Sequence, residues 1–148
     1  MRKRRKSREQ EDYSGLPGTL TRKQVQDALR RGNSLAGADL RRLNLSGLCF
    51  DGANLQACKM AEANLTRSTF RRANLARASL WRANLTDAIL DEATLDEADL
   101  DCSNMDGCSL HKARVRKAIF PQETVTMDDV RSAIRSGHRI RMTQMELD

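Results

Sequence analysis

The chain has 148 residues, of which 39% are hydrophobic, 3% aromatic and 31% charged, and its formal net charge is +6. This length suits one elongated domain with short additions at each end. No apolar run approaches membrane-spanning length and the basic start lacks the apolar stretch of a signal peptide, so we expect a cytoplasmic protein.

Residues 1–18 are polar and end in a Gly-Leu-Pro-Gly turn, which predicts a disordered basic tail. Six of the first eight side chains are basic, and they could neutralise several phosphates of a nucleic acid without reading its sequence. A tail that only keeps the protein soluble is the alternative. The residues of this candidate nucleic-acid tail are Arg2, Lys3, Arg4, Arg5, Lys6 and Arg8.

Residues 19–35 predict an N-terminal capping helix. Thr21 and Gln24 form a capping box, and Gly32 supplies the stop signal. A single apolar stripe, made by Val25, Ala28 and Leu29, predicts one buried face. Because a helix of this length is marginal alone in water, we expect it to dock on whatever apolar surface follows it.

Residues 36–120 repeat with a period of five. Every fifth residue is large and apolar, and the residue two before it is nearly always small. The large residues are Leu40, Leu45, Phe50, Leu55, Met60, Leu65, Phe70, Leu75, Leu80, Leu85, Leu90, Leu95, Leu100, Met105, Leu110, Val115 and Phe120.

A period of five fits neither a regular helix nor a flat strand. On a helix these side chains would spread around the whole surface, and on a strand each odd step would turn the side chain to the other face. The chain keeps them all inside only if it turns a corner once per repeat. The pattern therefore predicts an all-β solenoid wound around its own leucines.

The triplet Ala-Asn-Leu recurs four times, starting at Ala53, Ala63, Ala73 and Ala83. This pattern resembles the pentapeptide-repeat family. The resemblance implies a right-handed quadrilateral β-helix with four repeats, or twenty residues, in each coil. Seventeen repeats then give about four coils, with a capping α-helix at each end.

Folding the sequence at twenty residues per coil makes residues twenty apart vertical neighbours, about 4.8 Å from each other. Phe50 and Phe70 then stack, and the recurring asparagines fall on two opposite faces. Outward charges form ladders of alternating sign. The expected ladders are Arg42–Glu62–Arg82, Arg67–Asp87, Arg72–Glu92–Lys112, Arg77–Glu97–Lys117, Asp51–Arg71–Asp91 and Asp96–Arg116.

Residues 121–148 break the period and repeat the entrance segment. Residues 126–140 align with residues 21–35, so that Gly137 corresponds to Gly32 and Ile140 to Leu35. The segment is therefore interpreted as a helix followed by the first repeat of a second solenoid that does not continue. We expect a C-terminal helix/strand cap; a partner-facing or dimerising element is the alternative.

The sequence predicts neither an enzyme nor a cofactor or metal site. His111 and His138 have no carboxylate or thiol at a telling spacing, and no phosphate loop or zinc motif is present. The four cysteines lack a CxxC spacing. Cys58 and Cys108 occupy the small inward position, where cysteine acts as a compact apolar residue.

The remaining function classes are binding classes. A scaffold for an unidentified protein partner is favoured, with Trp81, Arg82, Arg77 and Arg72 as candidate partner-binding residues, because exposed Trp and Arg are typical anchors. Trp81 could instead shield the sheet over Ala61. The resemblance also suggests an alternative, a DNA mimic that acts on DNA gyrase or topoisomerase. However, acidic residues are confined to little more than one coil here, and the chain is basic overall. The sequence leaves open whether the protein is a monomer or a dimer through its C-terminal segment.

Overall fold

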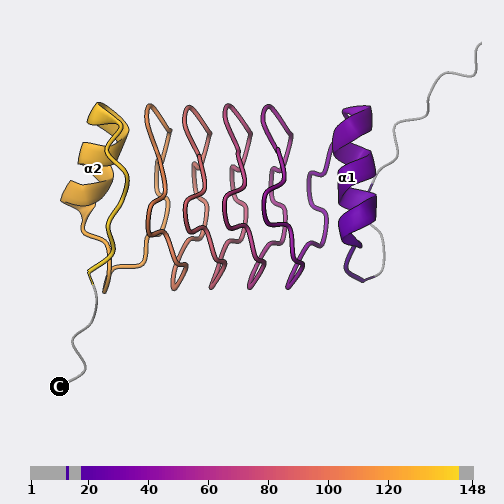
Figure 1. Cartoon of the computed structure of the whole chain (residues 1–148), viewed down its shortest axis with the longest axis horizontal. Coiled ribbons are helices and arrows are strands. Elements are labelled where there is room, and N and C mark those ends of the chain that lie inside the picture. The colour runs from indigo at the N-terminus through magenta and orange to yellow at the C-terminus, as the bar shows by residue number, and fades with distance from the viewer. Residues whose placement is uncertain (1–12, 14–17, 144–148) are drawn as a thin grey trace, which may run out of the picture.

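A computed structural model describes Tyr13 and residues 18–143 of the chain. Its two helices, α1 (Arg22–Arg31) and α2 (Met127–Ser136), lie at opposite ends of a stack of coils (Figure 1). The six basic residues of the predicted tail lie outside the described residues. In the part of the chain that the structure describes, neither helix is long and apolar enough to cross a membrane.

Parallel β-bridges join residues twenty apart, as the folded repeat predicts. One column of bridges runs Asp39, Lys59, Ser79, Asp99 and Ile119, and three further columns follow it around each coil. Each side is too short for a long strand, so the sheet consists of isolated bridges between closely spaced turns. The solenoid is therefore a β-helix of four coils (Figure 1).

Each corner is a turn that holds one residue in the left-handed region. In the first complete repeat, Arg42 has φ 61° and the amide of Leu43 donates to the carbonyl of Leu40. Thirteen of these residues are not glycine, although such a φ costs an L-residue roughly 1–2 kcal/mol. These turns reverse the strand alternation once per repeat and keep every fifth residue inside.

The predicted core is confirmed. Every large residue of the repeat from Leu40 to Leu110 is fully buried, and Phe120 is buried as well. Phe50 and Phe70 stack with their ring centroids 4.8 Å apart. Val115, in the last coil, is the exception because it is only half-buried.

The helix α1 closes the first coil. The predicted capping box of Thr21 and Gln24 is present, and Gly32 ends the helix in the left-handed conformation. The Arg22 guanidinium donates to the carbonyls of Asn44 and Ser46, at 2.8 and 3.0 Å. In the coils below, the equivalent carbonyls accept from backbone amides, so Arg22 replaces the missing coil at this edge.

The helix α2 closes the last coil. Thr126 and Asp129 form its capping box, and hydrogen bonds from Thr126 lower the pKa of the Asp129 carboxyl. Val130 and Ala133 are buried on the inner face. Ile134 accepts a hydrogen bond from the amide of Lys112 and thereby joins the helix to the coil.

The residues after α2 differ from the expected copy of a first repeat. Leu35 lies parallel to the coil below it, donating to the carbonyl of Asn54. Ile140 instead bonds Gly107 and Cys108, and Met142 lies near Asp106, so here the chain runs opposite to the coil. The aligned sequences cannot specify this direction, because the second copy meets the opposite edge of the solenoid and no later coil fixes its orientation.

The charge ladders are partly formed. Ion pairs between neighbouring coils join Arg42 to Glu62, Arg71 to Asp51, Arg72 to Glu92 and Arg77 to Glu97, at 3.6 to 3.9 Å. Asp96 forms its ion pair with Arg114, at 2.7 Å, and not with the side chain of Arg116. The carboxylate of Asp96 also accepts a hydrogen bond from the backbone amide of Arg116. The longer ladders end after two members in the described residues, because the central residue of each pairs with one opposite charge only. The expected ion pair of Arg67 with Asp87 is not formed there.

Candidate functional site

Trp81 lies at a turn of the third coil and is 37% exposed. The guanidinium carbon of Arg82 lies 5.3 Å from the centre of its ring, which is within cation–π range. Small Ala61 occupies the equivalent position one coil earlier, and the amide of Arg82 donates to Asp101 one coil later. Trp81 and Arg82 thus form one compact pair above Asp101.

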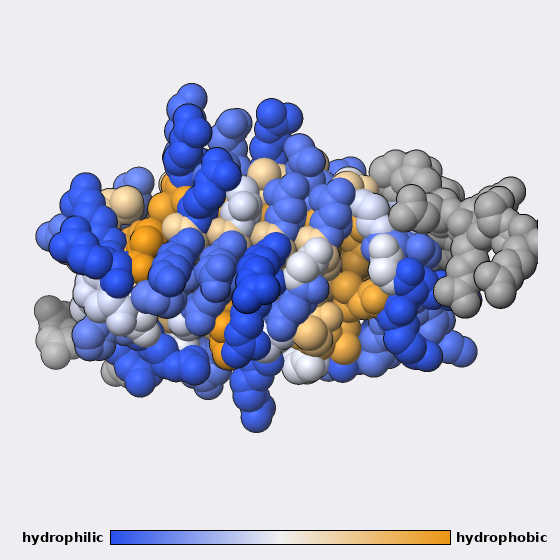
Figure 2. Space-filling view, turned by 90° about the horizontal axis from the view of Figure 1, so that it is seen from above, coloured by the Kyte–Doolittle hydropathy of each residue, from blue (hydrophilic) through white to orange (hydrophobic). Residues whose placement is uncertain are grey.

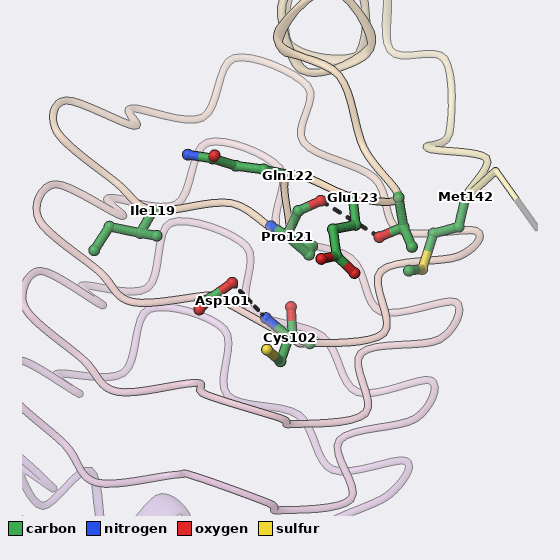
Figure 3. Close-up of a pocket in the computed structure, with 9 residues that line it drawn as sticks. Asp101, Cys102, Ile119, Pro121, Gln122, Glu123 and Met142 are labelled. Atoms are coloured by element: carbon green, nitrogen blue, oxygen red, sulfur yellow. Dashed lines mark hydrogen bonds between the residues drawn. The ribbon is translucent and has the colours of Figure 1, made fainter. Parts of the chain in front are cut away.

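A cavity of about 520 Å³ opens beside Asp101, between the last coil and the segment that leads to α2 (Figure 3). Apolar groups come from Ile119, Pro121 and Met142, and carboxylates from Asp101 and Glu123. Ile119 is 50% exposed. Cys102, Ser103, Gln122 and Thr124 complete the lining.

Desolvation and two carboxylates act on the thiol of Cys102 at this corner. Desolvation and the charges of Asp101 and Glu123 raise the pKa of the Cys102 thiol, while Arg82 lowers it. A thiol whose pKa is raised stays protonated and is a poor nucleophile. Cys102 therefore contributes a neutral, weakly polar surface beside Trp81 and the cavity.

We call Trp81, Arg82, Cys102 and Ile119 the Trp81 surface. Asp101 and Cys102 lie between Trp81 and Ile119. They follow Trp81 and Arg82 by one coil, and they line the same cavity as Ile119. The sequence analysis missed Ile119. The sequence did contain a sign of its exposure. The residue just before each large core residue faces outward, and among these residues only Ile89 and Ile119 are large and apolar.

The other two predicted binding residues do not belong to this surface. Arg72, Arg77 and Arg82 occupy three successive corners of the winding chain, so they face different directions. Arg72 and Arg77 are each held in an ion pair with the next coil. The structure therefore brings Trp81 and Arg82 together and separates them from Arg72 and Arg77.

Charge is arranged in belts around the solenoid. The coil of residues 59–78 carries five basic and one acidic side chains, and the coil of residues 79–98 carries one basic and five acidic ones. On the face drawn in Figure 2, hydrophilic side chains project in rows and hydrophobic residues show between them. The acidic side chains thus encircle the axis and do not run along it.

The described residues contain no group of His, Cys, Asp and Glu that could hold a metal ion. The four cysteines are unpaired thiols, and burial raises the pKa of Cys58 and of Cys108 to about 12. A Cβ atom built on Gly137 would lie 3.3 Å from Nδ1 of His111, and this nitrogen is buried without a hydrogen bond to the described residues. His111 thus packs against the C-terminal cap.

The sequence and the fold were compared with known protein families and solved structures. The sequence model of the family described as pentapeptide repeats matches this chain with eight copies, in residues 31–56, 49–87 and 78–116. Together these residues span more than half of the chain. The chain belongs to the pentapeptide-repeat family. Its solenoid is the right-handed β-helix of that family. No curated protein matches the chain significantly in sequence.

Solved pentapeptide-repeat structures are similar to this one. A protein from the Arabidopsis thaliana thylakoid lumen has 35% identity and a TM-score of 0.52, over 53% of this chain and 54% of its own. The alr5209 protein of Nostoc has 28% identity and a TM-score of 0.58, over 71% of this chain and 88% of its own. The chain thus spans about half the length of the first and most of the second.

The plasmid-mediated fluoroquinolone resistance protein QnrB1 is also similar. Its identity is 17% and its TM-score 0.52, over 55% of this chain and 40% of that protein. At this level the likeness concerns the fold alone.

Proposed function

We propose that this pentapeptide-repeat protein is a non-enzymatic scaffold that binds a protein partner through the Trp81 surface. One observation carries the proposal: of the three large hydrophobic residues that are exposed in the described chain, Trp81 lies one coil before Asp101, and Asp101 lines a cavity together with exposed Ile119. Trp and Arg, which lie side by side here, are among the residues most enriched in binding hot spots.

The surroundings of these residues support a protein ligand more than a small molecule. The cavity opens between a coil and a loop and holds two carboxylates, Asp101 and Glu123, around an apolar floor. A basic or amphipathic side chain of a partner fits such a site, with its aliphatic part against Ile119 and its charge near the carboxylates.

The arrangement of charge favours this scaffold over a DNA mimic. A mimic of duplex DNA needs acidic side chains that continue along the axis, because phosphates follow the duplex in that direction. Here the acidic coil lies next to a coil with five basic residues, and ion pairs with those arginines occupy Glu92 and Glu97.

Quantitative affinity purification with single variants tests the proposal. Trp81→Ala and Ile119→Ser should each lower the amount of the same captured protein about tenfold or more. Truncation of a hot-spot residue removes roughly 2 kcal/mol or more of binding free energy. Met127→Ser is the matched control, because Met127 is 50% exposed like Ile119 but lies on α2. A partner retained equally by all three variants contradicts the proposed surface.

A further inference from the structure

The lower edge of the last coil, residues 113–118, is open on one side of the solenoid. Among the described residues, the amides of Val115 and Lys117 and the carbonyls of Ala113 and Ala118 have no backbone partner. One coil earlier, the equivalent amides of Leu95 and Glu97 donate to Arg114 and Arg116, both at 2.7 Å. The lower edge therefore presents backbone amides and carbonyls with the spacing that pairs with one more strand.

In the described residues, the C-terminal cap forms no backbone hydrogen bond with the lower edge. Residues 134–142 bond the stretch from Asp106 to Lys112. Val115 and Ala118 are half-buried, whereas Leu95 and Ala98, one coil earlier, are fully buried. The amides and carbonyls are thus accompanied by apolar side chains that one additional strand would cover.

The charge beside this edge is basic and unbalanced. Lys112, Arg116 and Lys117 are exposed and form no ion pair with the described residues. Two columns of turn residues end there, one running Arg77, Glu97 and Lys117 and the other ending in Asp96 and Arg116. Because the sign alternates along each column, the next member of both would be acidic.

We propose that the lower edge binds an extended acidic segment of a partner protein as one further strand of the solenoid. Strand addition gains affinity from main-chain hydrogen bonds and specificity from alternate side chains. The segment places a small residue under Ala113, a large apolar residue under Val115 and two acidic residues under Arg116 and Lys117. This order is the one that Ala93, Leu95, Asp96 and Glu97 already have above the same strand.

Charge argues for a partner protein over a second copy of this chain. Two lower edges facing each other would oppose lysine and arginine from both sides. The outer helix α1 is also basic, with Arg22, Lys23, Arg30 and Arg31 against Asp27, so stacking one copy's lower edge on another's first coil again opposes like charges.

A peptide carrying residues 92–99 of this chain, Glu-Ala-Thr-Leu-Asp-Glu-Ala-Asp, is the probe, since this stretch pairs with the same strand from the other side. Fluorescence anisotropy with the full chain should give saturable binding that weakens with salt. Nuclear magnetic resonance should show slower hydrogen exchange at the Val115 and Lys117 amides. A peptide with Asp96→Lys and Glu97→Lys should not bind.

Two variants locate the binding. Arg116→Gln with Lys117→Gln should weaken it about tenfold, whereas Lys23→Gln with Lys59→Gln removes the same charge elsewhere and should not. Val115→Pro removes an amide that has no backbone partner among the described residues, so it should abolish binding while circular dichroism stays native. The double glutamine variant keeps the test valid if the proline variant is unfolded.

Three results overturn the proposal. The first is the absence of peptide binding to the full chain and to a chain that ends at Thr143. The second is binding to the shortened chain only, which assigns the edge to residues 144–148 of this protein. The third is sedimentation of the full chain as a dimer that the double glutamine variant dissociates, which assigns the edge to a second copy. Trp81→Ala should leave peptide binding unchanged, so the Trp81 surface is tested separately.

Discussion

At the scale of single residues, the solenoid depends on turns that most side chains adopt at a cost. Ala57 has φ 55° and donates its amide to the carbonyl of Ala76 on the next coil. Ala76 is at the first turn position, where φ is not positive. Replacing alanine with glycine should therefore have opposite effects on stability at these two neighbouring sites, because only Ala57 has a positive φ.

Ala57→Gly should stabilise the protein by roughly 0.5–1 kcal/mol, because glycine avoids the left-handed penalty by more than its extra chain entropy costs. Ala76→Gly should destabilise it by roughly 0.5–1 kcal/mol, since there only the entropy term acts. Urea denaturation of both variants measures the two signs. Equal signs would show that the turn geometry is not the one described.

Two buried thiols make stability sensitive to alkaline pH. Burial raises the pKa of Cys58 and of Cys108 from 9.0 to about 12, and the Cys58 thiol donates to the carbonyl of Ala38. Between these values the unfolded chain releases protons that the folded chain retains, so stability is full below pH 9.0 and falls as the pH rises toward about 12.

Each thiol should lower the free energy of unfolding by up to about 1.4 kcal/mol per pH unit in that window. Denaturation of the wild type and of a Cys58→Ala, Cys108→Ala variant at pH 8 and above gives the slopes. The variant should lose less stability per pH unit than the wild type. Parallel slopes would mean that the two thiols titrate normally in the folded protein.

At the scale of elements, the sequence predicted most of what is locally encoded. The five-residue register placed every core leucine from Leu40 to Leu110, and the Thr21 capping box and Gly32 placed α1. The direction of residues 140–142 was not predictable, because it depends on which edge the segment meets. The cavity beside Asp101 was missed for the same reason: it forms between a coil and a loop whose path no repeat determines.

The C-terminal cap should be required to keep the protein monodisperse. Truncation after Pro121 removes the cover from Leu110 and Phe120 and frees the amides of Gly107 and Lys112. Exposed strand edges with apolar neighbours pair with other chains, so we expect aggregation and a lower melting temperature. Light scattering and thermal denaturation measure both. A truncated protein that stays monodisperse and equally stable would show that the segment serves a partner and not the solenoid.

At the scale of the whole molecule, stability depends on an uninterrupted stack of layers. Each coil contacts mainly its two neighbours, so the array behaves as a chain of nearest-neighbour interfaces. Leu80 occupies the middle of the column that runs Leu40, Met60, Leu80, Leu100 and Phe120, and it is fully buried. A defect there separates the coils into two short halves, each with only one capping helix.

Leu80→Asp should therefore prevent folding. An unpaired carboxylate in this layer carries a desolvation penalty of several kcal/mol, comparable to the whole stability of a small domain, about 5–15 kcal/mol. Trp81→Asp is the control, since the next side chain along the chain faces outward at the turn. Circular dichroism and thermal denaturation should show a native, cooperative transition for the control and none for Leu80→Asp. A native spectrum and melting temperature for Leu80→Asp would mean that Leu80 does not belong to the packed interior and that the five-residue register is wrong.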